Sequence, residues 1–352
     1  MSSKEQENNM FNFQWHITEK CNLRCTHCYQ EDYSSVGEMS FEELRFVADR
    51  LIQALSKWNK KGKIAITGGE PFVKGEIFSL LQYLNDAPQV GNLYILTNGT
   101  LIDKEICKKI RGIPKVSRIQ ISLDGACAAT HDSIRGDGTF EKAIEGIKLL
   151  SSHGIKVNLM FTLQKCNSED IPALFDLAIQ NGINSLLVER FVPCGSGKQI
   201  ESEMVSSSEL QNVFQYISDR ADLEYDKGNK LMVVKQRPLW INIDPERARV
   251  NAKFPLHKQV GGICSIGLDN LTILHDGTVL PCRRLNVPIG NLKWDTLEKI
   301  WFTSDLLWQI ADKRNLKGKC NSCEFIPRCS GCRAVAYACT GDYLAEDPQC
   351  WK

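Results

Sequence analysis

The chain has 352 residues, a formal net charge of +1 and 24% charged residues. This length suggests one large domain plus a smaller one, and the balanced charge gives no electrostatic basis for a nucleic-acid or membrane-surface partner. No apolar run approaches the about 18 residues that a membrane span needs, and the first ten residues lack the apolar core of a signal peptide. We therefore expect a cytoplasmic protein.

Strands and helices alternate along the first 220 residues. Residues 1–12 are expected to form a disordered tail, and the alternation over Phe13–Ile17 predicts the first strand. A capping box, Ser40-Phe-Glu-Glu43, opens an amphipathic helix. The further strands are predicted at 63–67, 93–97, 118–123, 157–162 and 185–190, and the further helices at 78–84, 103–110, 140–150, 171–180 and 206–220.

This order of elements predicts an α/β fold built on a parallel sheet with right-handed crossovers. Six units, rather than eight, would make a partial (βα)6 TIM barrel with one open side and its chemistry at the C-terminal ends of the strands. We place the barrel at 13–222, a bridge at 223–262 and a small cysteine-rich domain at 263–352.

The cysteine-rich domain shows two further elements. Asp276-Gly277 is a strong signal for a β-hairpin between strands at 271–274 and 278–280. A single amphipathic helix is predicted over 296–310, and its Trp301 and Trp308 are expected to belong to the core.

Cysteine is abundant, with 15 residues. In a reducing compartment, clustered cysteines are better explained by metal than by disulfides. Three form a group near the start of the chain, and seven of the eight from Cys264 to Cys350 form a second group. Most of the remaining five are expected to be buried as small hydrophobic residues; they are Cys107, Cys127, Cys166, Cys194 and Cys339.

The first group is Cys21-Asn-Leu-Arg-Cys25-Thr-His-Cys28, directly after the first strand. A structural zinc site needs four protein ligands, and this loop has three cysteines. His27 would have to fold back into the same loop to become the fourth ligand. Three thiolates suit an iron–sulfur cube with one open iron better. The loop resembles that of the radical SAM superfamily, in which S-adenosylmethionine (SAM) occupies the open iron of a [4Fe–4S] cluster.

A second motif, Thr67-Gly-Gly-Glu-Pro71, follows the second strand and resembles the glycine-rich turn of the same family. Glycines let the backbone approach a ligand closely, and a carboxylate accepts hydrogen bonds from an ammonium group. The resemblance implies that Gly68, Gly69 and Glu70 hold the amino group of SAM.

Weaker matches follow the next two strands. The resemblance implies that four further residues contact SAM, although a turn or capping role is an equal alternative for each. These residues are Asn98, Ser122, Asp124 and Arg135.

The C-terminal cysteines resemble the SPASM extension, which holds auxiliary iron–sulfur clusters beside such a barrel. The resemblance assigns one cluster to Cys320, Cys323, Cys329 and Cys350, and a second to Cys264, Cys282 and Cys332. The second set has no clear fourth ligand, and Cys194 is the nearest upstream candidate. Spacing alone also allows a zinc ribbon at Cys320, Cys323, Cys329 and Cys332.

The resemblance implies an enzyme that reductively cleaves SAM to a 5′-deoxyadenosyl radical and takes a hydrogen atom from its substrate under anaerobic conditions. A ribosomally synthesised peptide is the leading substrate hypothesis, with a thioether or carbon–carbon crosslink or an oxidised side chain as product. Its partners would be a separate leader-binding protein and an electron donor such as a flavodoxin or ferredoxin. No catalytic acid or base is assigned.

Two alternatives remain. A tetrapyrrole side chain of the heme pathway is favoured by Cys329-Ser-Gly-Cys332, since some tetrapyrrole-modifying relatives share that two-residue gap, and by the basic pair Arg283-Arg284. Sulfatase-maturing relatives place an aspartate base after the cysteine that matches Cys282, so the pair argues against sulfatase maturation. The alternative from another class is a non-catalytic zinc-binding scaffold.

Overall fold

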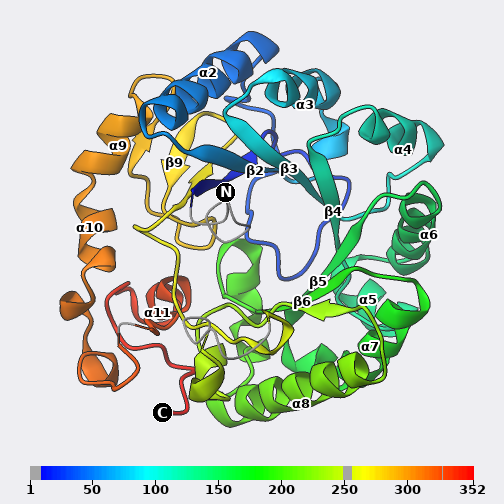
Figure 1. The fold of residues 1–352 in the computed structure, drawn as a ribbon, viewed down its shortest axis with the longest axis vertical. Helices are drawn as coiled ribbons and strands as arrows, with labels where there is room; N and C mark the ends of the chain where they lie inside the picture. Colours follow the sequence, from blue (N-terminus) through cyan, green and yellow to red (C-terminus); the bar gives the residue numbers. More distant parts are fainter. Residues whose placement is uncertain (1–8, 249–255, 327) are drawn as a thin grey trace.

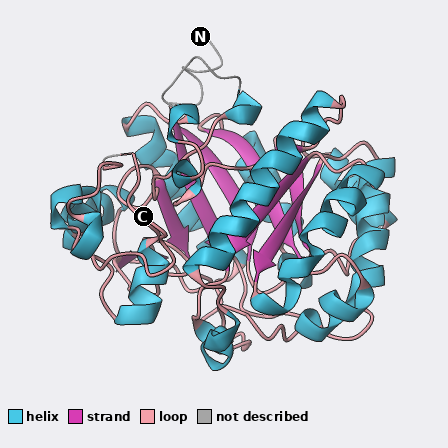
Figure 2. Cartoon of the chain, turned by 90° about the horizontal axis from the view of Figure 1, so that it is seen from below, coloured by secondary structure: helices cyan, strands magenta, loops and turns pink. Residues whose placement is uncertain are grey.

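The computed structural model describes residues 9–248, 256–326 and 328–352. Six parallel strands follow one another around the centre of the molecule, with helices outside them (Figures 1 and 2). They are β1 (Met10–His16), β2 (Lys61–Thr67), β3 (Val90–Thr97), β4 (Val116–Ser122), β5 (Val157–Leu163) and β6 (Ser185–Arg190). The predicted partial barrel is confirmed.

Helices connect these strands and bury one face each against the sheet. In the first of them, the Ser40 side chain accepts a hydrogen bond from the Glu43 amide while the Glu43 side chain accepts one from Ser40, as the capping box predicts. The helices are α2 (Phe41–Lys57), α3 (Ile77–Asp86), α4 (Lys104–Arg111), α5 (Ala128–Arg135), α6 (Thr139–Ser152), α7 (Ile171–Gln180) and α8 (Ser207–Asp226). Helix α5 was not predicted, because it buries only His131 and Ile134 and so has little periodicity.

The sheet continues beyond both edges of the six-strand core. At one edge the predicted hairpin, β8 (Asn270–Ile273) and β9 (Thr278–Leu280), joins the sheet because β8 pairs with β1 in parallel. At the other edge β7 (Met232–Val233), from the predicted bridge, pairs with β6. With β10 (Gly290–Asn291), the described strands form one sheet in the order β10-β9-β8-β1-β2-β3-β4-β5-β6-β7.

The prediction of one helix over 296–310 is wrong. The structure has α9 (Leu297–Thr303) and α10 (Asp305–Ala311), separated at Ser304, whose backbone is extended and whose side chain accepts a hydrogen bond from the Leu307 amide. Trp301 is buried and its ring lies 4.9 Å from that of Phe11, whereas Trp308 is 47% exposed and is not part of the core.

These helices and α11 (Arg333–Thr340) lie between α2 and α8, on the side that six strand–helix units leave open (Figure 1). Strand β1 begins at Met10, three residues earlier than predicted, because residues 10–12 pair with Lys61–Lys63. Of the rest of the predicted tail, residues 1–8 lie outside the described residues. No helix in the described ranges is long and apolar enough to cross a bilayer.

Candidate functional site

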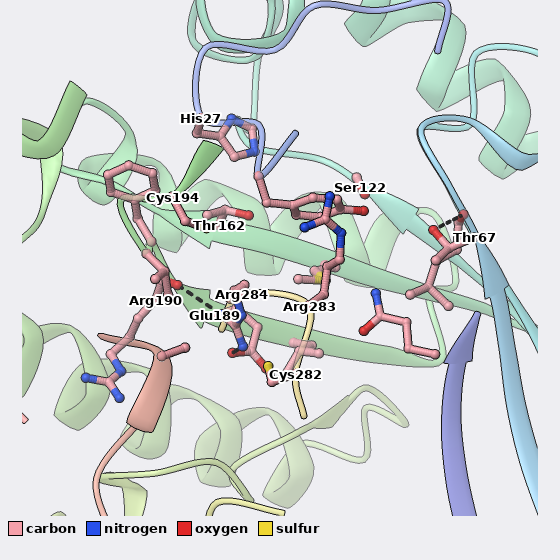
Figure 3. A pocket seen from close by; sticks show the side chains of 18 of the residues that line it. His27, Thr67, Ser122, Thr162, Glu189, Arg190, Cys194, Cys282, Arg283 and Arg284 are labelled. Carbon is pink, nitrogen blue, oxygen red and sulfur yellow. Dashed lines mark hydrogen bonds and ion pairs between the residues drawn. The ribbon is translucent and has the colours of Figure 1, made fainter. Parts of the chain in front are cut away.

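A cavity of about 320 Å³ is lined by the C-terminal ends of the core strands and the loops that follow them (Figure 3). Both cysteine groups reach it, together with several residues predicted to contact SAM. The predicted site residues that line it are Cys21, Cys25, Cys28, Gly69, Asn98, Ser122, Arg135, Cys264, Cys282 and Cys332. Glu70 and Asp124 are fully buried and lie behind the cavity wall.

The sulfur atoms of the first cysteine loop accept hydrogen bonds. The Leu23 amide lies 3.4 Å from Cys21 Sγ, and the Gln30 amide lies 3.5 Å from Cys28 Sγ. Burial raises the pKa of the Cys25 thiol to about 11. The thiol therefore keeps its proton at neutral pH unless a bound metal cation displaces it. Three cysteines on one loop with sulfur-directed N–H groups fit the ligand set of an iron–sulfur cluster.

The glycine turn after β2 lies directly against the segment that enters the cysteine loop. The Gly69 amide donates to the Thr18 carbonyl at 2.8 Å, and the Glu70 amide donates to the Lys20 carbonyl at 2.9 Å. A Cβ atom on Gly69 would lie 2.3 Å from the Lys20 oxygen, so this approach requires glycine. Gly68 is equally constrained, because its Cβ would lie 2.5 Å from the Thr18 oxygen.

The Glu70 carboxylate joins the turn to the end of β3. It accepts hydrogen bonds from Thr97 Oγ1 at 2.8 Å, from the Asn98 amide at 2.8 Å and from the Phe72 amide at 3.2 Å. Burial nevertheless raises the pKa of Glu70 to about 7. These contacts assign the side chain to positioning the turn, and its contact with a SAM ammonium group stays a prediction.

Asp124 has a comparable position at the end of β4. Arg135 Nε donates to its Oδ2 at 2.6 Å, the Thr162 amide donates to Oδ1 at 2.7 Å, and His27 Nε2 lies 3.2 Å from Oδ2. Arg135 Nη1 in turn lies 3.8 Å from Cys25 Sγ. Asp124 therefore orients a cation toward the cysteine loop, and its contact with SAM stays a prediction.

The loop after β6 contributes contacts that the sequence did not reveal. The Gly197 amide donates to the Cys28 carbonyl, and the Ser196 amide donates to the Gln30 carbonyl, both at 3.1 Å. A Cβ atom on Gly195 would lie 2.2 Å from the Tyr29 carbonyl carbon. The available signal was the Gly-Ser-Gly run after Cys194, which indicates a loop that approaches another backbone closely.

Four more arginines line the cavity. Glu189 pairs with Arg284 at 3.1 Å and with Arg237 at 2.7 Å, whereas Arg190 pairs with Asp347 at 2.9 Å. Figure 3 shows Arg284 directed at Glu189 and Arg190 pointing away from both. The fourth, Arg283, has its guanidinium 4.3 Å from the centre of the Tyr29 ring.

A second, small cavity brings together the four cysteines predicted to share one cluster, namely Cys320, Cys323, Cys329 and Cys350. The Gly331 amide lies 3.5 Å from Cys329 Sγ, and Asn242 Nδ2 lies 3.6 Å from Cys350 Sγ. Cys332 instead lines the main cavity with Cys264, Cys282 and Cys194. The resemblance implies the same division, and the role of each cysteine as a cluster ligand stays a prediction.

Two family models match the chain. The model of the radical SAM superfamily matches residues 15–178, and that of the iron–sulfur cluster-binding domain called SPASM matches residues 264–324. The fold is similar to the crystal structure of Streptococcus suis SuiB bound to the precursor peptide SuiA, with a TM-score of 0.76 and 19% identity over 99% of this chain and 78% of that one.

Two curated relatives differ in their named products. The chain is 32% identical to an AdoMet-dependent heme synthase of Methanosarcina barkeri, over 96% of this chain and 95% of that protein. It is 28% identical to an antilisterial bacteriocin subtilosin biosynthesis protein of Bacillus subtilis, over 90% of this chain and 65% of that protein.

Proposed function

Because the chain belongs to the radical SAM superfamily and carries a SPASM domain, we propose that it acts on a side chain of an iron tetrapyrrole of the heme pathway. Family membership implies a [4Fe–4S] cluster, SAM and auxiliary iron–sulfur clusters. When bound, the first cluster supplies the electron that cleaves SAM to methionine and a 5′-deoxyadenosyl radical, which takes a hydrogen atom from the substrate.

The residues of the chain then hold and orient these groups. Cys21, Cys25 and Cys28 would ligate the first cluster, and the turn at Gly69 would approach SAM through its backbone. Glu70 and Asp124 are fully buried behind the cavity wall, and each holds a neighbouring hydrogen-bond donor, the Asn98 amide and the Arg135 guanidinium, in place.

The observation that carries the choice of substrate is the charge of the cavity. Five of the described residues that line it are arginines; four of these pair with only three carboxylates, and the fifth, Arg283, has no acidic partner among the described residues. Guanidinium groups bind carboxylates in a bidentate manner, so this excess of positive charge suits a substrate that carries carboxylates. Porphyrins of the heme pathway carry such groups as propionate side chains.

The relatives change the order of the two substrate hypotheses. A peptide ranks first on sequence, yet the heme synthase matches over 95% of its length and the bacteriocin protein over 65%. Peptide maturation remains the second candidate function, supported by that bacteriocin relative. A non-catalytic zinc scaffold has no support from a radical SAM family assignment.

Anaerobic turnover distinguishes the two substrates. We expect the reconstituted enzyme, with SAM and a reductant, to form 5′-deoxyadenosine and to change the mass of an iron tetrapyrrole such as iron coproporphyrin III. An unchanged tetrapyrrole, together with a mass change in a precursor peptide encoded by a neighbouring gene, would reject this proposal and favour peptide maturation.

The predicted partners become part of the proposal. A flavodoxin or ferredoxin is the electron donor that such chemistry needs, and a separate leader-binding protein belongs only to the peptide alternative. We retain a cytoplasmic location as a proposal, because clustered cysteines that bind iron require a reducing compartment.

A further inference from the structure

Arg283 differs from the other arginines of the cavity. Each of those forms an ion pair, whereas Arg283 has no acidic partner among the described residues. Its side chain is only 7% exposed, and its Nε atom has no hydrogen-bond partner in the described structure. A guanidinium group keeps its charge in a protein, and a buried charge without a counter-ion is costly. The position therefore indicates a binding site for an anion.

The guanidinium is held in one place by the Tyr29 ring, 4.3 Å away. Tyr29 is itself fixed, because its hydroxyl donates to the Gly68 carbonyl at 3.2 Å and its ring meets that of His16 edge-on at 5.5 Å. Since Tyr29 follows Cys28 directly, an anion on Arg283 would lie beside both the cysteine loop and the glycine turn.

Two kinds of carboxylate are available in this enzyme, that of SAM and those of the substrate. Residues Asn98 and Ser122, which resemble SAM contacts, lie at the C-terminal ends of β3 and β4. Arg283 follows β9, and strands β8, β1 and β2 separate β9 from β3 in the sheet. Figure 3 shows that Arg283 also extends away from the Arg284–Glu189 pair. This placement favours the substrate, because Arg283 enters from the C-terminal part of the chain.

We propose that Arg283 binds one propionate carboxylate of the tetrapyrrole and thereby places that side chain next to the radical source. The inference rests on the proposed function, since it names the contact by which the same cavity selects its substrate. Arg283 is in this sense a specificity residue, and Tyr29 is the positioning residue that orients it.

Equilibrium binding to the reconstituted holoenzyme tests this without turnover. The probes are iron coproporphyrin III and its tetramethyl ester, which lacks the carboxylate charges, and binding is followed by visible absorbance. We expect Arg283→Gln to weaken binding of the acid about ten- to a hundredfold, the effect of losing a hydrogen bond between charged groups. Arg283→Lys keeps the charge without the bidentate geometry, so its affinity for the acid should lie between those of the wild type and Arg283→Gln.

The ester identifies the interacting group. In the wild-type enzyme, esterification should weaken binding by at least as much as Arg283→Gln does, whereas in the variant it should cost less because one partner is already missing. Arg118→Gln is the matched control, since Arg118 also stacks on a tyrosine, Tyr94, at 5.1 Å, but lies in β4, far from the C-terminal strand ends. This control should bind both probes like the wild type.

Iron content and sulfide content report whether each variant is folded. If Arg283→Gln binds the acid as tightly as the wild type, or if esterification costs both proteins the same, the assignment is overturned while the proposed function stands. Weakened SAM binding with unchanged tetrapyrrole binding would assign Arg283 to SAM and overturn it equally. If the wild type binds no tetrapyrrole and modifies a peptide, the proposed function fails as well.

Discussion

Buried carboxylates organise the site at the scale of single residues. Glu70, Asp124 and Glu189 are each at least nine-tenths buried and each accepts from two or more donors. Burial alone would raise the pKa of Asp124, but Arg135, His27 and the Thr162 amide together hold it below its usual value. These groups are thus a fixed electrostatic frame around the cavity.

Replacing Asp124 with asparagine should remove the counter-ion of a buried arginine. Because the Arg135 side chain is only 10% exposed, we expect the free energy of unfolding to fall by about 3–5 kcal/mol. Anaerobic thermal or denaturant unfolding of the holoenzyme measures it.

The control for this substitution is Lys198→Gln, which breaks the exposed Lys198–Glu31 pair. Exposed pairs contribute about 0–1 kcal/mol, so this variant should unfold almost like the wild type. Equal and small losses in both variants would show that Asp124 is not the anchor of Arg135.

Gly69 is the second residue whose substitution is decisive. A methyl group at this position would lie 2.3 Å from the Lys20 oxygen, so Gly69→Ala must displace the turn. Overpacking costs about 1–3 kcal/mol, and we expect SAM affinity to fall about five- to a hundredfold. Gly75→Ala, whose Cβ would meet nothing within 4 Å, should bind SAM normally. Equilibrium SAM binding compares the two, and equal affinities would contradict the role of the turn.

The site residues predicted from the sequence are those of short motifs with local spacing. The cysteine loop and the glycine turn are short motifs, and the structure places them in contact. The stacking of Arg283 on Tyr29 and the contacts of Gly195–Gly197 with the cysteine loop were not predictable. They join residues that lie far apart in the chain, and no periodicity or spacing encodes such a meeting.

At the scale of elements, the β8–β9 hairpin is attached to the loop that leads into the first cysteines. His275, at the turn of the hairpin, contacts Glu19 Oε1 through Nδ1 at 3.1 Å and the Val36 carbonyl through Nε2 at 3.2 Å. Burial lowers the pKa of His275, but Glu19, Asp276 and the Val36 carbonyl together raise it above its ordinary value of 6.5.

This contact predicts a pH dependence. A histidine with a raised folded pKa stabilises the fold fully below its unfolded pKa, and the effect is lost as pH rises through the folded pKa. We expect His275→Gln to lower the melting temperature at pH 6, by the equivalent of about 1 kcal/mol or less, and to have little effect at pH 9. The same difference at both pH values would rule out a charged His275.

The helices and strands show which sequence patterns are sufficient to locate an element. Strand β6 and helix α7 occur at the predicted residues, since a buried apolar run and a 3.6-residue period are local patterns. Strand β7 escaped prediction because it is two residues long and owes its structure to pairing with β6. The break between α9 and α10 also escaped, because Ser304 ends one helix and caps the next without interrupting the apolar pattern.

At the scale of the whole molecule, the proposed function assigns different steps to the two cysteine groups. Cys25→Ala should abolish 5′-deoxyadenosine formation, because two thiolates hold a cluster poorly. Cys323→Ala, which alters the separate small cavity, should spare part of the SAM cleavage while losing product. Chromatography of 5′-deoxyadenosine and product in the same reaction measures both. Full product formation by Cys323→Ala would deny that cluster a catalytic role.

The pairing of β1 with β8 has a consequence for synthesis on the ribosome. The Asn12 side chain bonds to the Asp269 carbonyl across 257 positions of the chain. At a translation rate of about 5–20 residues per second, roughly 10 to 50 s pass between the synthesis of β1 and that of β8, the strand that covers its outer edge. An uncovered strand edge is a template for pairing with other chains. Nascent chains of this protein should therefore depend on chaperones until translation reaches the hairpin.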